Sequence, residues 1–245
     1  MARKGQAETP LGGQYEHMAS HVPAGTDRAA SLRVNGYSAD DTAGVPEGSV
    51  KMGMGCGNPA ALAALRPGQI VLDLGAGSGL DAFIAAKKVG AKGKVIGVDA
   101  TPAMVERATA FAAEGGYGNV EFRHGQIEHL PLGSESIDVI ISNCVINHAR
   151  DKAAAFKEAH RVLKPNGEIC ITDLVVEGTI GRSDDPGMKI WEEWLAVACG
   201  KKEYLAAMNE AGFRDVVVRE TAYAGQAMIS ALNGKIISLH INARK

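Results

Sequence analysis

The sequence predicts an α/β protein built on a doubly wound, mostly parallel sheet that ends in an antiparallel hairpin. Three observations support this prediction. Short apolar segments alternate with amphipathic ones between residues 70 and 176, and a glycine-rich stretch follows the first of them. Two further strand-like segments close the chain. Alternating strands and helices are typical of a parallel sheet with helices on both faces.

The predicted strands of the central sheet are apolar on both faces, which indicates that helices cover the sheet from both sides. We expect these strands at 70–74, 94–98, 120–123, 137–142 and 168–176. Amphipathic patterns predict helices at 80–89, 102–114 and 152–163, and a shorter helix that starts at Pro59. Pro102 suits the first turn of its helix, and Thr101 is a candidate N-cap.

The two ends of the chain differ from this core. Residues 1–50 are rich in small and polar residues and show no sustained period, so we expect an irregular leader that folds over an active site. Near the other end, we expect helices at 186–199 and 201–211 and a hairpin of strands at 214–222 and 235–243. We therefore divide the chain into a leader (1–50), a core (51–180) and a substrate-side segment of helices and closing strands (181–245).

The composition is that of a globular protein. Of the 245 residues, 46% are hydrophobic, and the formal net charge is −2. Such a charge produces no broad positive field, so we predict no nucleic-acid partner. No apolar run approaches the roughly 20 residues of a membrane span, and none follows the basic N-terminus, so we predict a cytoplasmic protein without membrane association.

The four cysteines do not match a zinc site. Cys56, Cys144, Cys170 and Cys199 contain no CxxC pair, and their spacing fits no zinc finger or ribbon. In a cytosolic protein thiols stay reduced, and most are small buried apolar residues. We interpret Cys170, in the middle of an apolar strand, in this way.

The strongest local motif is VLDLGAGSG at residues 71–79, because it follows a strand and opens a helix. Its glycines let the backbone turn tightly and approach a ligand, but the third glycine of the dinucleotide-binding fingerprint is absent. The second strand ends at Asp99, about 20 residues further on, where a carboxylate can accept hydrogen bonds from a ribose diol. Taken alone, Asp99 is equally well explained as an acidic residue that stabilises the N-terminus of the following helix. Together, the loop and the acid favour a nucleoside ligand on a Rossmann-like sheet.

Two later turns carry polar groups to the same edge. Gln126 and Ile127 follow the third strand, where a side-chain amide and a backbone N–H can meet an adenine edge. The fourth strand runs into Ser142, Asn143 and Cys144, at the end of the sheet where α/β folds bind ligands.

Taken in order, VLDLGAGSG, GVDAT, GQIE, DVIISN and RVLKPNG make the chain resemble the class I S-adenosylmethionine-dependent methyltransferases over about residues 70–176. The resemblance implies S-adenosylmethionine as the cofactor. It further implies three groups of contacts: Asp73, Gly75, Ala76, Gly77 and Asn143 with the methionine moiety, Asp99 with the ribose hydroxyls, and Ala100, Gln126 and Ile127 with the adenine.

A narrower resemblance, over about residues 36–176, is to the arsenite methyltransferases. It is carried by GYS at 36–38, VPEG at 45–48, GCGNP at 55–59, VIGVD at 95–99 and IISNCVIN at 140–147, followed by Asp151-Lys152. In that family three cysteine thiolates bind trivalent arsenic, whose lone pair attacks the methyl group, and soft thiolates suit this thiophilic element. The resemblance implies that Cys56 and Cys144 are arsenic ligands, with an external thiol as reductant. We also expect the glycines beside Cys56 to give access to its thiol.

The third cysteine of the family pattern falls on Trp194 in this chain, ten residues before Tyr204. Cys199 lies five residues after Trp194, about 140° around a helix. Either a shifted register lets Cys199 take the role, or two thiols remain. The chain is also shorter than the family pattern between Tyr223 and Lys235.

Two other functions stay open. In the first, the methyl acceptor is a small organic molecule, Trp191 and Trp194 form an apolar pocket, and His148 is a general base. The opposing interpretation makes the tryptophans core or lid residues and His148 a solvated residue at a helix entry. In the second, the protein is a non-catalytic sensor that binds an arsenical or the cofactor, although the full cofactor signature argues for catalysis.

Overall fold

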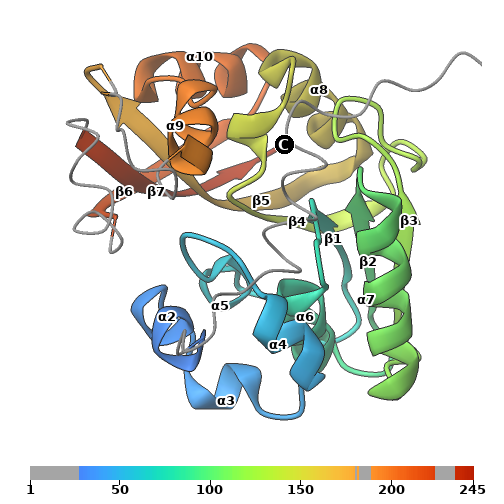
Figure 1. Cartoon of the computed structure of the whole chain (residues 1–245). Coiled ribbons are helices and arrows are strands. Elements are labelled where there is room, and N and C mark those ends of the chain that lie inside the picture. Colours follow the sequence, from blue (N-terminus) through green and yellow to red (C-terminus); the bar gives the residue numbers. More distant parts are fainter. Residues whose placement is uncertain (1–27, 180, 182–188, 224–234) are drawn as a thin grey trace, which may run out of the picture.

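The structure is a computed structural model that describes residues 28–179, 181, 189–223 and 235–245. Within this part of the chain, a seven-stranded sheet has the order β3-β2-β1-β4-β5-β7-β6 (Figure 1). The strands are β1 Ile70–Leu74, β2 Lys94–Asp99, β3 Val120–His124, β4 Ile137–Asn143, β5 Leu163–Glu177, β6 Arg214–Ala222 and β7 Lys235–Arg244.

The strand directions confirm the predicted fold class. Strands β3, β2, β1, β4 and β5 pair in parallel, whereas β7 pairs antiparallel with both β5 and β6. The sheet is therefore Rossmann-like, doubly wound and mostly parallel, and it is completed by an antiparallel C-terminal hairpin. Of the residues between the two hairpin strands, 224–234 lie outside the described part of the chain.

Helices cover both faces of the sheet. Figure 1 shows α2–α6 on one side and α8–α10 on the other. The helices are α2 Arg28–Val34, α3 Ala39–Thr42, α4 Glu47–Met52, α5 Pro59–Leu62, α6 Leu80–Val89, α7 Pro102–Glu114, α8 Lys152–Val162, α9 Lys189–Ala196 and α10 Lys201–Glu210, with a short 3₁₀ turn, η1, at Ile146–His148.

Successive residues of the central strands belong to two different apolar clusters. Leu72 of β1 packs in one cluster with Phe156 of α8 and Tyr204 of α10. Its neighbour Val71 packs in the other cluster with Phe83 of α6. Since side chains alternate between the two faces of a strand, the apolar strands predicted from the sequence are explained by helices on both faces.

The expectation of an irregular leader is wrong for residues 28–50, which form the short helices α2, α3 and α4. Local groups stabilise them: Ser38 and Asp41 make a reciprocal capping box at the start of α3. The Lys87 ammonium of α6 donates to three carbonyls of this segment. Helices of four to seven residues are too short to produce a visible period in the sequence. Residues 1–27 lie outside the described part, and the division of the chain at residues 50 and 180 stays a prediction.

Candidate active site at the carboxyl edge of the sheet

The glycine loop after β1 is held against the end of β2. The N–H groups of Gly75 and Ala76 both donate to the carbonyl oxygen of Val98, at 2.8 and 3.0 Å. Gly75 and Gly77 have φ angles of +66° and +52°, in the left-handed region that favours glycine. A β-carbon on Gly75 would also lie 2.4 Å from the Val145 side chain. The backbone therefore requires glycine at both positions.

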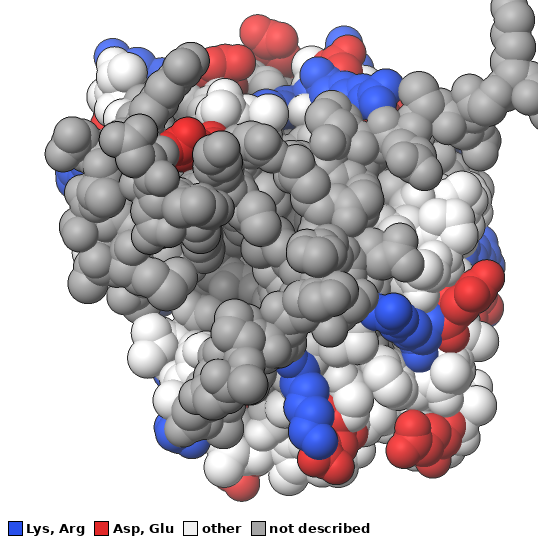
Figure 2. All heavy atoms as spheres, viewed as in Figure 1, with Lys and Arg blue, Asp and Glu red and all other residues white. Residues whose placement is uncertain are grey.

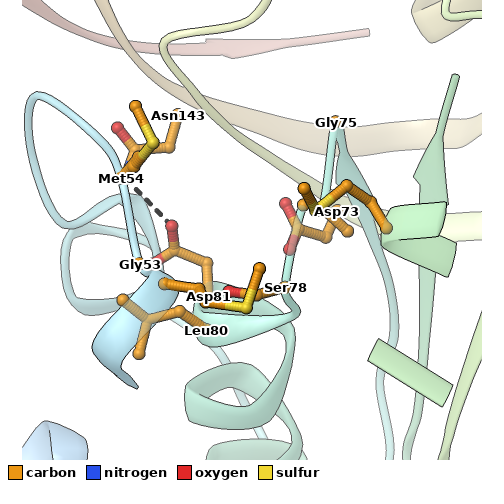
Figure 3. Close-up of a pocket in the computed structure, with 12 residues that line it drawn as sticks. Gly53, Met54, Asp73, Gly75, Ser78, Leu80, Asp81 and Asn143 are labelled. Carbon is orange, nitrogen blue, oxygen red and sulfur yellow. Dashed lines mark hydrogen bonds between the residues drawn. The ribbon is translucent and has the colours of Figure 1, made fainter. Parts of the chain in front are cut away.

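A pocket lies beside this loop, between the ends of β1 and β4 and the start of α6 (Figure 3). The Asp73 and Asp81 carboxylates face it from opposite sides, and Asn143 closes one end. The pocket is lined by Met52, Gly53, Met54, Asp73, Gly75, Ala76, Gly77, Ser78, Leu80, Asp81, Met104 and Asn143. It thus brings together five of the predicted cofactor-binding residues: Asp73, Gly75, Ala76, Gly77 and Asn143.

The chemistry of this pocket suits a positively charged ligand. Asp73 is 2% exposed, and its Oδ2 atom has no hydrogen-bond partner within the described residues. Burial, followed by the charges of Asp81 and Asp99, raises the pKa of Asp73 well above its usual value. Burial also raises the pKa of Asp81 to about 6. A buried, unpartnered carboxylate oxygen that faces a second carboxylate is stabilised by a cation, which offsets the lost hydration and the repulsion.

Asp99 ends β2 and organises the backbone beside the pocket. Its two carboxylate oxygens accept hydrogen bonds from the N–H groups of Gly77 and Thr101, each at 2.9 Å. Thr101 precedes α7 as predicted, but its side chain makes no cap hydrogen bond. Asp99 therefore fixes both the glycine loop and the start of the next helix.

The remaining predicted cofactor-binding residues lie next to Asp99 and do not line the pocket. The N–H of Gly125 donates to the Asp99 carbonyl oxygen at 3.0 Å, which places the turn after β3 beside Asp99 and Ala100. In that turn Gln126 is exposed, whereas Ile127 is 9% exposed and belongs to the apolar core. Of these two residues, only Gln126 presents its side chain to the surface.

Cys56 and Cys144 are brought together although they are 88 positions apart in the sequence. Both are buried, and the Cys56 thiol donates to the side chain that precedes Cys144, with 3.8 Å between Cys56 Sγ and Asn143 Oδ1. They lie in an apolar cluster, the thiol cluster, made of Cys56, Cys144, Leu174, Val176, Trp194, Leu195 and Ile236. Burial, followed by the proximity of Cys56, raises the pKa of Cys144 well above its usual value. The unliganded Cys144 is therefore a neutral thiol at neutral pH.

The backbone at Cys144 is unusual. Its φ angle is +57°, a left-handed conformation that is uncommon for a residue other than glycine, and its N–H donates to Thr172 O at 2.8 Å. Such strain persists only where surrounding contacts impose it, and it is frequent at functional sites. The turn carries the chain from β4 into η1 directly after Asn143.

Asn143 clamps the loop that carries Cys56, residues 53–58, which we term the Cys56 loop. Its Oδ1 accepts from the N–H of Cys56 at 3.0 Å and from the Thr172 hydroxyl at 2.9 Å, and its Nδ2 donates to Gly57 O at 2.8 Å. A β-carbon on Gly55 would lie 2.3 Å from Asn143 Nδ2. The expectation that glycines expose the thiol is therefore wrong, because Cys56 is only 6% exposed and the glycines allow close packing.

Cys199, the third predicted thiol ligand, packs in a different apolar cluster from Cys56 and Cys144, although its carbonyl oxygen accepts from the N–H of Val176, a member of the thiol cluster, at 3.4 Å. Cys199 belongs to the core cluster that includes Tyr204, and its N–H donates to Asn147 Oδ1 at 3.1 Å. Burial raises the pKa of its thiol to about 11. Trp194, at the position where the family pattern has a cysteine, packs in the thiol cluster instead. Cys170 is 3% exposed in β5, in agreement with its interpretation as a core residue.

His148 is not the solvated residue that was the opposing interpretation. Its ring packs against the Trp194 ring with 4.5 Å between centroids, and its Nδ1 is buried without a hydrogen-bond partner in the described structure. Burial, with a smaller contribution from Lys152, lowers its pKa to about 4. The imidazole is therefore neutral at pH 7. The side chain of Trp191 lies outside the described residues.

The sequence patterns did not identify several residues of the site. Tyr37 and Asp81 hydrogen-bond each other and Asn143 beside the pocket. Asp173, in the middle of β5, is fully buried and accepts from the Tyr204 hydroxyl at 3.0 Å and the Asn147 N–H at 2.9 Å. A charged residue inside an apolar strand is a signal that could have identified Asp173.

On the face that Figure 2 shows, the described residues carry charges of both signs. Figure 2 shows acidic and basic side chains next to one another on the described part of this face. Within the described residues, no helix combines the length and the apolar character that crossing a bilayer requires.

Comparisons with known proteins agree with this architecture. A family profile described as a methyltransferase domain matches residues 65–212. The chain is 44% identical over 193 residues to an arsenite methyltransferase of Halobacterium salinarum, which covers 79% of this chain and 49% of that protein. It is 40% identical over 168 residues to an arsenite methyltransferase of Aquipseudomonas alcaligenes, and this match covers 66% of this chain and 48% of that protein. The chain thus spans about half the length of these curated relatives.

A solved structure supports the same assignment. The crystal structure of CrArsM, an arsenic(III) S-adenosylmethionine methyltransferase from Chlamydomonas reinhardtii, superposes with a TM-score of 0.65 at 34% identity. The match covers 89% of this chain and 73% of that one. Because the family profile spans more than half of the residues and the strand order carries the predicted motifs to one edge, we conclude that the chain belongs to the methyltransferase domain family.

Proposed function

We propose that this protein binds S-adenosylmethionine and transfers its methyl group to trivalent arsenic held by Cys56 and Cys144. The observation that carries the proposal is the buried pair Cys56 and Cys144 beside the pocket. Cys144 directly follows Asn143, which lines the pocket. The names of the two curated relatives and of CrArsM support the choice of arsenic.

The pocket residues fit the proposed cofactor. Asp73 Oδ2, which lacks a partner, would accept a hydrogen bond from the ammonium group of the methionine moiety. The glycine loop would bring backbone close to the ligand, and Asp99, with its neighbour Ala100, would face the ribose and the base. When bound, S-adenosylmethionine would supply an electrophilic methyl group to an arsenic lone pair, so the chain itself has to orient the acceptor and exclude water.

A cysteine thiol can bind arsenic without first losing its proton to water. Arsenous acid is neutral, and each thiol replaces one of its hydroxyl groups: an As–O bond breaks, an As–S bond forms, and the thiol proton leaves with the hydroxyl as water. The raised pKa of Cys144 is therefore compatible with binding. Methylation would oxidise arsenic from the trivalent to the pentavalent state as the sulfonium leaves as a neutral thioether. Two external thiols, which become a disulfide, would return arsenic to the trivalent state.

The structure favours arsenic over a small organic acceptor. An O- or N-methyltransferase needs a base for the acceptor proton, and His148 was the candidate. A pKa of about 4 makes this imidazole a poor proton acceptor at neutral pH. Attack by an arsenic lone pair releases no proton and needs no base.

Transfer of a labelled methyl group tests the proposal. We expect labelled methylarsenicals from the wild type in the presence of arsenite and a thiol reductant, and none from Cys56→Ser or Cys144→Ser. Cys170→Ala is the matched control, because it removes a buried thiol from the core of the sheet and should retain transfer. Cys199→Ser should retain it too, since Cys199 lies in a different cluster.

The possible failures are distinct. Cofactor binding by calorimetry without transfer to arsenic would refute the choice of acceptor. Nearly intact transfer in both serine variants to an organic acceptor would favour the alternative function. Absence of S-adenosylmethionine binding would refute the whole proposal.

A further inference from the structure

Asn143 contacts both halves of the site. It lines the pocket, and its carboxamide also holds the Cys56 loop. On the pocket side its Nδ2 lies 2.9 Å from Asp81 Oδ2 (Figure 3). The same nitrogen lies 2.9 Å from the Tyr37 hydroxyl oxygen. On the loop side the same nitrogen lies 2.8 Å from Gly57 O.

This nitrogen has more acceptors than hydrogens. A carboxamide nitrogen carries two hydrogens, yet three acceptors lie within hydrogen-bond distance of Asn143 Nδ2. The Tyr37 hydroxyl donates its single hydrogen to the Asp81 carboxylate, with 2.9 Å between the hydroxyl oxygen and Oδ1. The Tyr37 oxygen can therefore only accept from Asn143. The hydrogen bond to Gly57 therefore competes with those on the pocket side, and a charged acceptor is the stronger competitor.

We propose that Asn143 is a positioning residue that couples the occupancy of the pocket to the geometry of the Cys56 loop. A cationic ligand that engages the Asp73–Asp81 pair weakens the hold of Asp81 on Asn143, and the released hydrogen then strengthens the bond to Gly57 and orders the loop. The cofactor and trivalent arsenic then bind cooperatively. This inference rests on the proposed function, since it assigns the pocket and the thiols to those two ligands.

Calorimetric titration of arsenite, with and without saturating sinefungin, measures the coupling in the wild-type protein. Sinefungin is an unreactive cationic analogue of S-adenosylmethionine. We expect sinefungin to tighten arsenite binding by about fivefold or more, and arsenite to tighten sinefungin binding by the same factor, because linkage is reciprocal. A factor below about twofold in the wild type would overturn the inference.

Two variants separate coupling from simple support of the loop. Asp81→Asn keeps the shape and an acceptor but removes the charge, so the coupling factor should fall below about twofold. Ser238→Ala is the matched control: the Ser238 hydroxyl donates to Cys56 O at 3.0 Å, and Ser238 does not line the pocket. It should weaken arsenite binding and leave the coupling factor unchanged.

Each outcome is informative. Equal loss of coupling in both variants would mean that general loosening of the loop explains the effect, which contradicts the inference. If Asp81→Asn can no longer be saturated with sinefungin, the coupling factor is measured in Asn143→Ala instead, and circular dichroism checks that this variant is folded. Absence of binding by either ligand would refute the proposed function instead, whereas independent binding of both would refute only the coupling.

Discussion

Replacing His148 by phenylalanine should flatten the acid side of the stability profile of this protein. The imidazole packs against Trp194 and is largely buried, and Lys152 adds a like charge to any proton that it takes up. Its pKa is therefore about 4, below the usual 6.5. Phenylalanine preserves the aromatic packing and removes the titration.

The sign and the size follow from this displacement. In the unfolded chain the imidazole takes up a proton as the pH falls through 6.5, whereas in the folded protein it does so only near pH 4. Its contribution to stability is fully present above pH 6.5 and is lost as the pH falls through 4. A shift from 6.5 to about 4 is worth about 3 kcal/mol, at about 1.36 kcal/mol for each pKa unit.

Urea denaturation followed by circular dichroism, at several pH values and constant ionic strength, measures this difference. Between pH 7.5 and pH 4 the wild type should lose about 3 kcal/mol more of its unfolding free energy than His148→Phe. Asp81 and Asp173, each with a pKa raised to about 6 by burial, contribute with the opposite sign. Their effect is common to both proteins and cancels in the comparison.

Parallel stability profiles for the two proteins would refute this reasoning. A His148 resonance that titrates near pH 6.5 in nuclear magnetic resonance spectra of the folded protein would refute it independently, because it would show that the ring is hydrated.

Three further predictions concern the site. Gly55→Ala forces a β-carbon against Asn143, so arsenite binding should weaken by about 1–3 kcal/mol in calorimetry. Cofactor binding should change little. Equal losses for both ligands would contradict the packing argument. Asp99→Ala should weaken S-adenosylmethionine binding about 10- to 150-fold in the same assay, since a charged hydrogen-bond acceptor is worth about 1.5–3 kcal/mol. Tyr204→Phe leaves the buried Asp173 with one donor fewer, and urea denaturation should show a loss of about 1–3 kcal/mol; an unchanged midpoint would mean that water replaces the hydroxyl.

The central sheet was predictable because its signals are local. Each core strand is a short apolar run, and the glycine loop reports a required backbone conformation at Gly75 and Gly77. Both features are visible in consecutive residues. The helices of residues 28–50 were missed because they are short and because long-range contacts stabilise them, such as the Tyr37 hydroxyl with Asp81, 44 positions away.

The sequence predicted where the polar residues of the candidate site lie, but not the contacts that they make. Strand ends correctly placed Asp73, Asp99 and Asn143 at one edge, since parallel strands share their carboxyl edge. The sequence could not show that Asn143 makes hydrogen bonds both to the Cys56 loop and to the pocket residue Asp81, nor that Cys199 packs in another cluster. Both facts depend on how separate elements pack.

The hydrogen bond from Ser238 to the carbonyl of Cys56 has a consequence for folding. It joins residues 182 positions apart, and Ser238 belongs to β7, which is inserted between β5 and β6. Contacts between residues distant in the sequence form slowly, because a long loop must close first. The glycine loop and its strands can assemble from the first half of the chain, whereas the thiol cluster, which includes Ile236, is complete only after the last strand has paired. A chain released before its last strand is made would therefore have the glycine loop but not a complete thiol cluster.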